Sequence, residues 1–253
     1  MRERNARRAA LAVLALLAST CAACSATNGS ARPDYDPWEP MNRGIFWFNN
    51  KADEFVLEPV ARGWDFITPR RVQDSVSNIF YNMRFPINTV NNVLQADGRD
   101  AGIHIARFMV NTTFGLAGIF DVASDWGLVT QEEDFGQTLG RWGLGPGPYL
   151  MVPILGPSTL RDAFRYPVDG FISGIGYTGY GIVFSGAYVV EAVNFRAQNL
   201  DTIERAKEAS IDYYSAVRNL YLQRRRALIN DSNQIPNELN EDLYNADEFE
   251  ELP

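Results

Sequence analysis

Few residues in this chain could do chemistry, and their spacing argues against an enzyme. His104 is the only histidine, so any Ser–His–Asp site would have to use it. Neither a G-x-S-x-G elbow nor an H-E-x-x-H motif occurs. The G-x-G-x-G run at 143–147 lacks the Lys-Ser/Thr of a phosphate loop, and its interleaved prolines remove backbone N–H donors. The sequence therefore predicts no catalytic residue, no metal and no enzymatic activity.

His104 belongs instead to a polar stripe in the segment AGIHIARFMVNTTFGLAGIFDVA (101–123). Arg107 and Asn111 follow it at i+3 and i+7, so a helix would carry all three on one narrow face. The rest of the segment is apolar nearly all round, as a helix buried in lipid or deep in protein requires. Two interpretations stay open: the stripe borders a polar passage, or it is a buried polar seam between helices.

The only two cysteines lie in an N-terminal pattern typical of a lipoprotein signal. Arginines precede the apolar run AALAVLALLA (9–18), which is shorter than the roughly 20 residues of a membrane span. Lipoprotein processing needs small residues before the cysteine; Cys24 follows two alanines, whereas Cys21 follows a threonine. We expect a signal at 1–23 and S-diacylglycerol and N-acyl groups on Cys24, less so on Cys21. The alternative is an ordinary cleaved signal with incidental cysteines.

The flanking segments are polar and set the charge of the chain. Ser25 follows the favoured cysteine and favours the outer membrane, because aspartate there commonly retains lipoproteins in the inner membrane. Residues 24–37 are predicted to be a flexible tether, and 231–253, with eight acids and no Lys or Arg, a disordered or loosely helical tail. Loss of 1–23 takes the net charge from −8 to −11, of which 24–230 carry only −3. Nothing here predicts a nucleic-acid partner.

Residues that typically begin or end a helix recur through 38–230 and predict one all-α domain. Thr68 is a good N-cap with Pro69 at the first helical position, and Pro86 begins a segment that stops at Asp97-Gly98. Ser158 is predicted to cap a helix that Pro167 ends. Asp201 and Glu204 have capping-box spacing at the start of a long C-terminal helical stretch.

Two further segments have unusual composition. FISGIGYTGYGIVFSGAYVV (171–190) holds twenty residues without a charge, which is just enough to span a bilayer. Its five glycines favour close helix approach, and we prefer a helix buried in one lipid leaflet or in the core over a spanning helix. Gly143, Gly145 and Gly147 alternate with Pro146 and Pro148, which excludes a helix and predicts a shaped loop.

Three blocks of the sequence strongly resemble the MlaA/VacJ family of lipoproteins. DPWEPMNRGIFWFNNKADEFVLEPVARGW (36–64) has the family's Asp-Pro-x-Glu-x-x-Asn-Arg opening, and ARFMVNTTFGLAGIFDVAS (106–124) has its Arg-Phe-x-x-Asn-Thr block. DFGQTLGRWGLGPGPYLMVPILGPSTLRD (134–162) has its Phe-Gly-x-Thr-Leu-Gly and Gly-Pro-Tyr elements. Residues 200–225 are similar to the family's C-terminal helices. The resemblance covers roughly residues 34–230.

The resemblance implies a membrane-embedded helical ring with a central amphipathic channel, on the periplasmic side of a Gram-negative outer membrane. Family members associate with trimeric porins and remove phospholipid from the outer leaflet. The lipid passes to a soluble periplasmic MlaC-like shuttle that feeds an inner-membrane ABC transporter, which maintains lipid asymmetry. The resemblance places a membrane-facing hairpin at Phe114, Leu116, Ile119 and Phe120. It places a gating loop at Gly143, Gly145, Gly147 and Tyr149.

The residues are consistent with that task. Acyl chains must stay against apolar walls, whereas a head group cannot cross bare hydrocarbon cheaply. We therefore expect His104, Arg107 and Asn111 to border the head-group path. No nucleotide site is visible, so the chain could provide only a downhill route. The alternatives are a lipoprotein that scaffolds a porin without transport and a lipid-modifying enzyme.

Overall fold

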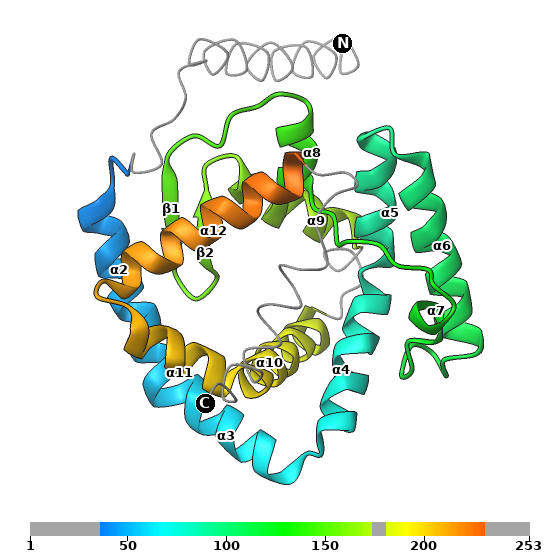
Figure 1. Ribbon diagram of the computed structural model, residues 1–253, viewed down its shortest axis with the longest axis horizontal. Coiled ribbons are helices and arrows are strands. Elements are labelled where there is room, and N and C mark those ends of the chain that lie inside the picture. The colour runs from blue at the N-terminus through cyan, green and yellow to red at the C-terminus, as the bar shows by residue number, and fades with distance from the viewer. Residues whose placement is uncertain (1–35, 174–180, 231–253) are drawn as a thin grey trace, which may run out of the picture.

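The computed structural model describes residues 36–173 and 181–230, so Cys21, Cys24, the signal, most of the tether and the acidic tail lie outside the described residues. Most of what it describes is helical, which confirms the predicted helical body. Figure 1 shows successive helices following one another around the perimeter of the molecule. The first, α2 (Glu39–Ala52), continues through a π-helical turn, Asp53–Leu57, into α3 (Glu58–Ile67). Together they form one long curved rod.

The next helices build the opposite side of the perimeter. They are α4 (Arg70–Met83), α5 (Phe85–Leu94), α6 (Gly98–Thr113) and the short α7 (Val122–Asp125). The expected N-cap at Thr68 is wrong: Thr68 ends α3 in an extended conformation, and Pro69 is the residue that precedes α4. Proline restricts the residue before it to extended angles, so Thr68 cannot continue α3. Pro86 does lie in the first turn of α5, and Asp97 caps α6.

One small antiparallel sheet interrupts the helices. After α8 (Phe135–Arg141), β1 (Tyr149–Val152) pairs with β2 (Gly156–Thr159), so that Tyr149 lies opposite Thr159. The helix cap expected at Ser158 is wrong, because this residue lies fully buried in β2. A 3₁₀ turn (Asp162–Phe164) and α9 (Arg165–Ile172) follow. Pro167 does not end a helix but lies in the first turn of α9. A proline is tolerated there because backbone N–H groups in the first turn have no carbonyl acceptor within the helix.

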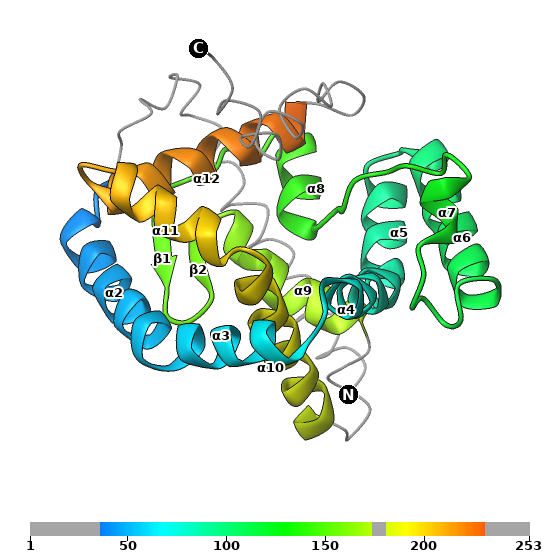
Figure 2. The same cartoon turned by 60° about the horizontal axis from the view of Figure 1, so that its bottom comes forward.

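The C-terminal part consists of α10 (Gly181–Gln198), α11 (Leu200–Ala209) and α12 (Tyr213–Asn230). Helix α10 packs against α3 and α4 and projects past α3 in Figure 2. The capping box expected at Asp201 is wrong, because Asn199 precedes α11 and makes no side-chain cap. The uncharged run 171–190 covers the end of α9, residues outside the described part, and the start of α10. Within 36–173 and 181–230, no helix combines the length and apolarity needed to cross a membrane.

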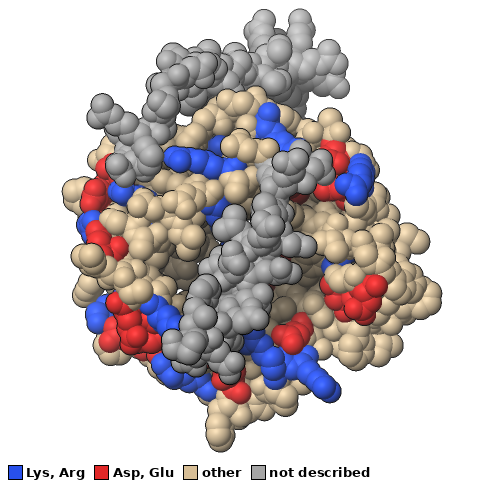
Figure 3. Space-filling model, viewed as in Figure 1, with Lys and Arg blue, Asp and Glu red and all other residues tan. Residues whose placement is uncertain are grey.

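The distribution of polar and apolar side chains is inverted relative to an ordinary soluble domain. The helices bury Asn42, Gln73, Asn88, Asn194 and many other polar residues. Large apolar side chains instead face outward, among them Phe66 at 91% exposed and Phe55 at 70%. Figure 3 shows a face that is mostly uncharged, with acidic and basic residues lying next to each other in a few patches. Exposed apolar area of this extent is typical of a surface that binds another protein, a membrane or an apolar ligand.

Candidate functional site

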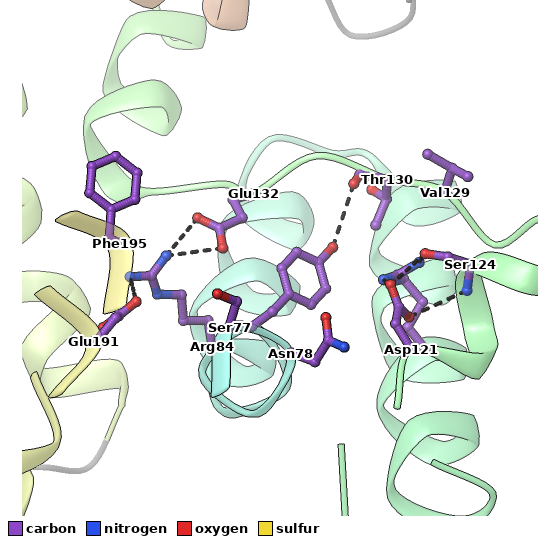
Figure 4. Close-up of a pocket in the computed structure, with 12 residues that line it drawn as sticks. Ser77, Asn78, Arg84, Asp121, Ser124, Val129, Thr130, Glu132, Glu191 and Phe195 are labelled. Carbon is purple, nitrogen blue, oxygen red and sulfur yellow. Dashed lines mark hydrogen bonds and ion pairs between the residues drawn. The ribbon is translucent and has the colours of Figure 1, made fainter. Parts of the chain in front are cut away.

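A cavity of about 340 Å³ lies between α4, α6, the segment 121–132 and α10 (Figure 4). Among the described residues it is lined by Ser77, Asn78, Tyr81, Arg84, Arg107, Asp121, Ser124, Val129, Thr130, Glu132, Glu191 and Phe195. The size is within the usual range for small-molecule sites. The lining mixes polar and apolar surface and holds five charged groups, although the outer surface of the same helices is apolar.

Arg107 forms one wall of the cavity and is nearly saturated with hydrogen bonds. Its guanidinium donates to both carboxylate oxygens of Asp121, at 2.9 and 2.8 Å, and to the Ser124 hydroxyl at 3.0 Å. It also donates to the Leu128 carbonyl. Helix α6 positions the side chain because Arg107 lies on the narrow polar face predicted from the sequence. The same bonds fix the segment 121–128 against α6.

The other two residues of the stripe stand behind this wall. Asn111 donates to Asp121 at 2.9 Å and accepts the backbone N–H of Ala123 at the same distance. A ring nitrogen of His104 lies 3.0 Å from the Gln131 carbonyl oxygen, and burial lowers the pKa of His104. His104, Arg107, Asn111 and these partners form the polar seam of α6, one of the two arrangements that the sequence left open. Only Arg107 of the three lines the cavity.

The turn after α6 carries the expected membrane-facing residues on its outside. Phe114, Leu116, Ile119 and Phe120 are all exposed, the first by 63%. Leu116 and Ala117 have positive φ angles, which L-residues rarely adopt, so the turn is tightly constrained. The seam holds it through Asp121, so the polar face of α6 determines where this apolar turn lies.

Arg84 crosses the cavity and joins two separate elements. It lies between α4 and α5 and donates to Glu132 at 3.0 and 2.8 Å, and its other terminal nitrogen pairs with Glu191 of α10. Figure 4 shows the guanidinium between the two carboxylates. Burial raises the pKa of Glu191 above its ordinary value. The three side chains remain partly exposed, Arg84 by 39%.

A second cavity, of about 60 Å³, adjoins the same ion pair. Arg84 and Glu191 line both cavities, but the other walls of the smaller one include Phe80, Met83, Ile87 and Tyr188. The ion pair therefore lies between a cavity with several charged groups and a mainly apolar one. An amphiphilic molecule with a charged end and an apolar end fits such a pair of neighbouring environments better than either a sugar or a hydrocarbon does.

The expected gating loop lies away from this cavity. Gly143 and Gly147 have φ angles of 89° and 66°, a left-handed conformation that glycine adopts without strain, whereas Gly145 does not. Tyr149 begins β1 and is only 1% exposed, packed against Met151 and Tyr214. The four residues are thus split between an irregular loop and the anchored strand that follows it.

Sequence patterns do not single out Arg84, Glu132 or Glu191. Arg84 occupies the junction between two helices, and Glu132 lies in a segment without regular structure. A signal did exist for Glu191, since it is the first charged residue after the uncharged run 171–190. An isolated carboxylate on an apolar helix is a functional candidate. Its partner could not be inferred, because 107 positions separate it from Arg84.

Replacing Arg107 with leucine should lower the free energy of unfolding by about 2 kcal/mol. Asp121 and the Leu128 carbonyl would lose their shared donor, but the Asp121 side chain is 28% exposed, so water can replace part of the bond. Urea unfolding in mild detergent measures the change. R62L is the matched control, since Arg62 is 60% exposed and pairs with Glu58 on the surface of α3. Equal losses in the two variants would contradict a stabilising seam.

The pKa of Glu133 makes stability depend on pH. Burial raises it to about 7 from 4.5, and the hydrogen bond donated by Gln95 offsets only part of this. The folded state therefore holds a proton that the unfolded state has released, so stability falls as the pH rises from 4.5 to 7 and is constant above. E133Q should remove that part of the decline, roughly 2 kcal/mol after allowance for solvent screening. Asp169, with a pKa raised by burial to about 6, titrates in wild type and variant alike. The free energy of unfolding is measured at pH 4.5 and pH 8 for wild type and E133Q. An equal difference between the two pH values in both proteins would show that Glu133 is not responsible for the decline.

Comparison with known proteins places this arrangement in a family. The family model described as MlaA lipoprotein matches residues 34–228. The "intermembrane phospholipid transport system lipoprotein MlaA" of Escherichia coli K12 is 34% identical over 210 residues, which cover 80% of this chain and 82% of that protein. An uncharacterised protein of Rickettsia felis is 33% identical over 196 residues, 77% of this chain and 78% of its own length.

A solved structure gives the same result in three dimensions. It comes from work on the "structural basis for maintenance of bacterial outer membrane lipid asymmetry" and matches with a TM-score of 0.66 and 35% sequence identity. The match covers 77% of this chain and 99% of the other. These findings confirm the resemblance seen in residues 36–64, 106–124 and 134–162. The chain is a member of the MlaA lipoprotein family.

Proposed function

We propose that this chain removes mislocalised phospholipid from the outer leaflet of the outer membrane and passes it toward the periplasm, thereby maintaining lipid asymmetry. The observation that carries the proposal is the inverted polarity: large apolar side chains face outward while charged groups line a half-open cavity. The name of the Escherichia coli relative, a phospholipid-transport lipoprotein, supports it. The chain acts as a binding and transport protein rather than an enzyme.

The physical requirement explains why such a protein needs this distribution. Moving a phospholipid with about 30 buried methylenes into water would cost on the order of 24 kcal/mol. A transport path must therefore keep the acyl chains beside apolar walls and the head group beside polar ones. The exposed apolar exterior would sit in the inner leaflet as a helical ring, held by acyl groups on Cys24. Arg107 would border the head-group path, with His104 and Asn111 holding the wall behind it.

The direction of transport requires partners. The chain would receive lipid from the outer leaflet next to a trimeric porin and release it to an MlaC-like periplasmic shuttle that feeds an inner-membrane ABC transporter. The turn with Phe114, Leu116, Ile119 and Phe120 would provide membrane contact. A protein with only a passive route moves lipid down its gradient, so the energy must be supplied elsewhere.

The loop with Gly143, Gly145, Gly147 and Tyr149 would act as the gate. Gly145→Trp tests this cleanly, because a Cβ at Gly145 would have no atom within 4 Å and the residue has no positive φ. The variant should fold and reach the membrane yet clear outer-leaflet phospholipid several-fold more slowly. Gly44→Trp is the control, since that glycine on α2 is equally unobstructed. Normal clearance by the Gly145 variant would remove the loop from the mechanism.

The decisive experiment measures outer-leaflet phospholipid in a strain from which the gene is deleted, and in the same strain carrying the gene on a plasmid. Loss of the chain should raise the outer-leaflet phospholipid, and wild-type protein should restore the normal level. R107L protein that folds and restores normal clearance would exclude the head-group role of Arg107. A structural lipoprotein that only scaffolds a porin would leave the leaflet composition unchanged, and that result would overturn the proposal.

A further inference from the structure

The charges around the larger cavity suggest which phospholipids the site prefers. Its lining among the described residues holds two cations, Arg84 and Arg107, and three carboxylates, Asp121, Glu132 and Glu191. Asp121 accepts hydrogen bonds from Arg107 and Ser124. The charges of Asp121 and Arg107 therefore cancel, and neither side chain is left to bind a ligand. The remaining excess of negative charge lies at Arg84, where one guanidinium faces two carboxylates.

This local excess determines which ligand charge the cavity favours. An anionic head group would bring a further negative charge to a site that already has one carboxylate too many. A head group with both a phosphate and an ammonium would add no net charge, and its cation would satisfy the excess carboxylate. Phe195 follows Glu191 by four residues on α10 and also lines the cavity, and its ring, which is 63% exposed, would offer the ammonium a second favourable contact.

Exchange of partners is feasible because the ion pairs are partly hydrated. The side chains of Arg84, Glu132 and Glu191 are 39%, 44% and 22% exposed, and exposed pairs contribute little to stability. Arginine binds a phosphate through two parallel hydrogen bonds as readily as it binds a carboxylate. By contrast Arg107 is only 6% exposed and could not leave Asp121 without leaving a buried charge unpaired.

We infer that Arg84 takes the phosphate and Glu132 and Glu191 take the ammonium of a zwitterionic aminophospholipid, so that the site selects these lipids over anionic ones. The inference rests on the proposed function and adds a substrate class to it. The adjoining smaller cavity, lined by Phe80, Met83, Ile87 and Tyr188, lies on the far side of the same ion pair. Opening the pair would join the charged cavity to the apolar one, with the glycerol backbone where Arg84 and Glu191 now meet.

The test compares two short-chain lipids on the purified, detergent-solubilised full chain by isothermal titration calorimetry. Dihexanoylphosphatidylethanolamine should bind about tenfold more tightly than dihexanoylphosphatidylglycerol. In E132Q/E191Q the preference should disappear, through weaker binding of the first lipid and stronger binding of the second. R84Q should weaken both. E54Q is the control, because Glu54 forms an exposed pair with Lys51 outside the cavity and should leave both affinities unchanged.

The possible results separate this inference from the proposed function. Equal affinity for the two lipids, or a preference for the anionic one, overturns the selectivity while leaving phospholipid transport intact. Failure of the wild-type chain to bind either lipid overturns both. Glycerophosphoethanolamine should compete with the bound lipid whereas glycerophosphoglycerol should not; equal competition would show that the head group does not carry the preference. If the double variant does not fold, the affinities of the wild type and of E191Q for the two lipids test the inference instead.

Discussion

Asp162→Ala should destabilise the protein by about 3–5 kcal/mol, one of the two largest losses expected from a single substitution in the described part of the chain. Asp162 is fully buried and accepts from Arg225 at 2.9 and 3.1 Å, from Arg161 at 2.9 Å and from the Tyr221 hydroxyl at 2.8 Å. The two arginine side chains are only 5% and 7% exposed. Removing the carboxylate leaves one guanidinium without its acidic partner and the other with Asp134 alone, far from water.

Two further variants separate charge from shape. D162N keeps the shape and some hydrogen bonds, so its loss should be smaller than that of D162A. D125A removes an exposed carboxylate from α7 and should change stability by less than about 0.5 kcal/mol. Thermal and urea unfolding in detergent rank the three. If D162A were no less stable than D125A, the buried ionic junction of α8, the 3₁₀ turn and α12 would contribute nothing to stability.

The same junction should be sensitive to acid. Arg225 and its neighbours hold the pKa values of Asp134 and Asp162 below the ordinary value of 3.8, against the opposing effect of burial. A depressed carboxylate pKa stabilises the fold above the unfolded value, and that stabilisation is lost as the pH falls through the folded value. D162N should therefore flatten the acid limb of the stability curve below pH 3.8.

Gly115→Ala should cost about 3 kcal/mol or more, because its added Cβ would meet backbone rather than a movable side chain. The Cβ would lie 2.2 Å from the Phe120 carbonyl oxygen and 2.6 Å from that of Asn111. Neither atom can retreat easily, since the Gly118 N–H donates to Asn111 and the Phe120 N–H donates to Gly115 itself. The turn that carries Phe114 and Phe120 would have to open.

A glycine in the preceding helix is the matched control for this effect. Gly102 lies within α6 and has no atom within 4 Å of an added Cβ. G102A should stabilise the chain by up to about 1 kcal/mol, because alanine favours a helix interior over glycine. The two variants make the same chemical change in neighbouring parts of the chain. Similar unfolding curves for both would rule out the close backbone approach at Gly115, and normal lipid clearance by G115A would rule out a functional role for the turn.

The sequence predicted most of the helices and missed the elements that depend on distant partners. Pro86 and Asp97 act locally, so the bounds of α5 were predictable from neighbouring residues. Ser158 looks like a helix cap in isolation, but pairing of its strand with 149–152 and its complete burial decide its conformation. Asp201 has the spacing of a cap, yet the turn at Asn199 begins α11 two residues earlier than that spacing implies.

The sequence by itself determined the family, the single polar face of α6 and the irregular glycine loop, because each is a local pattern of residue types. Only the tertiary structure decided what the polar face contacts: Arg107 is bonded to Asp121 and Leu128 as well as facing a cavity. It also placed Arg84 between Glu132 and Glu191, residues 48 and 107 positions away. The physical reason is that the partner of a charge depends on how the elements pack, which no short window of sequence contains.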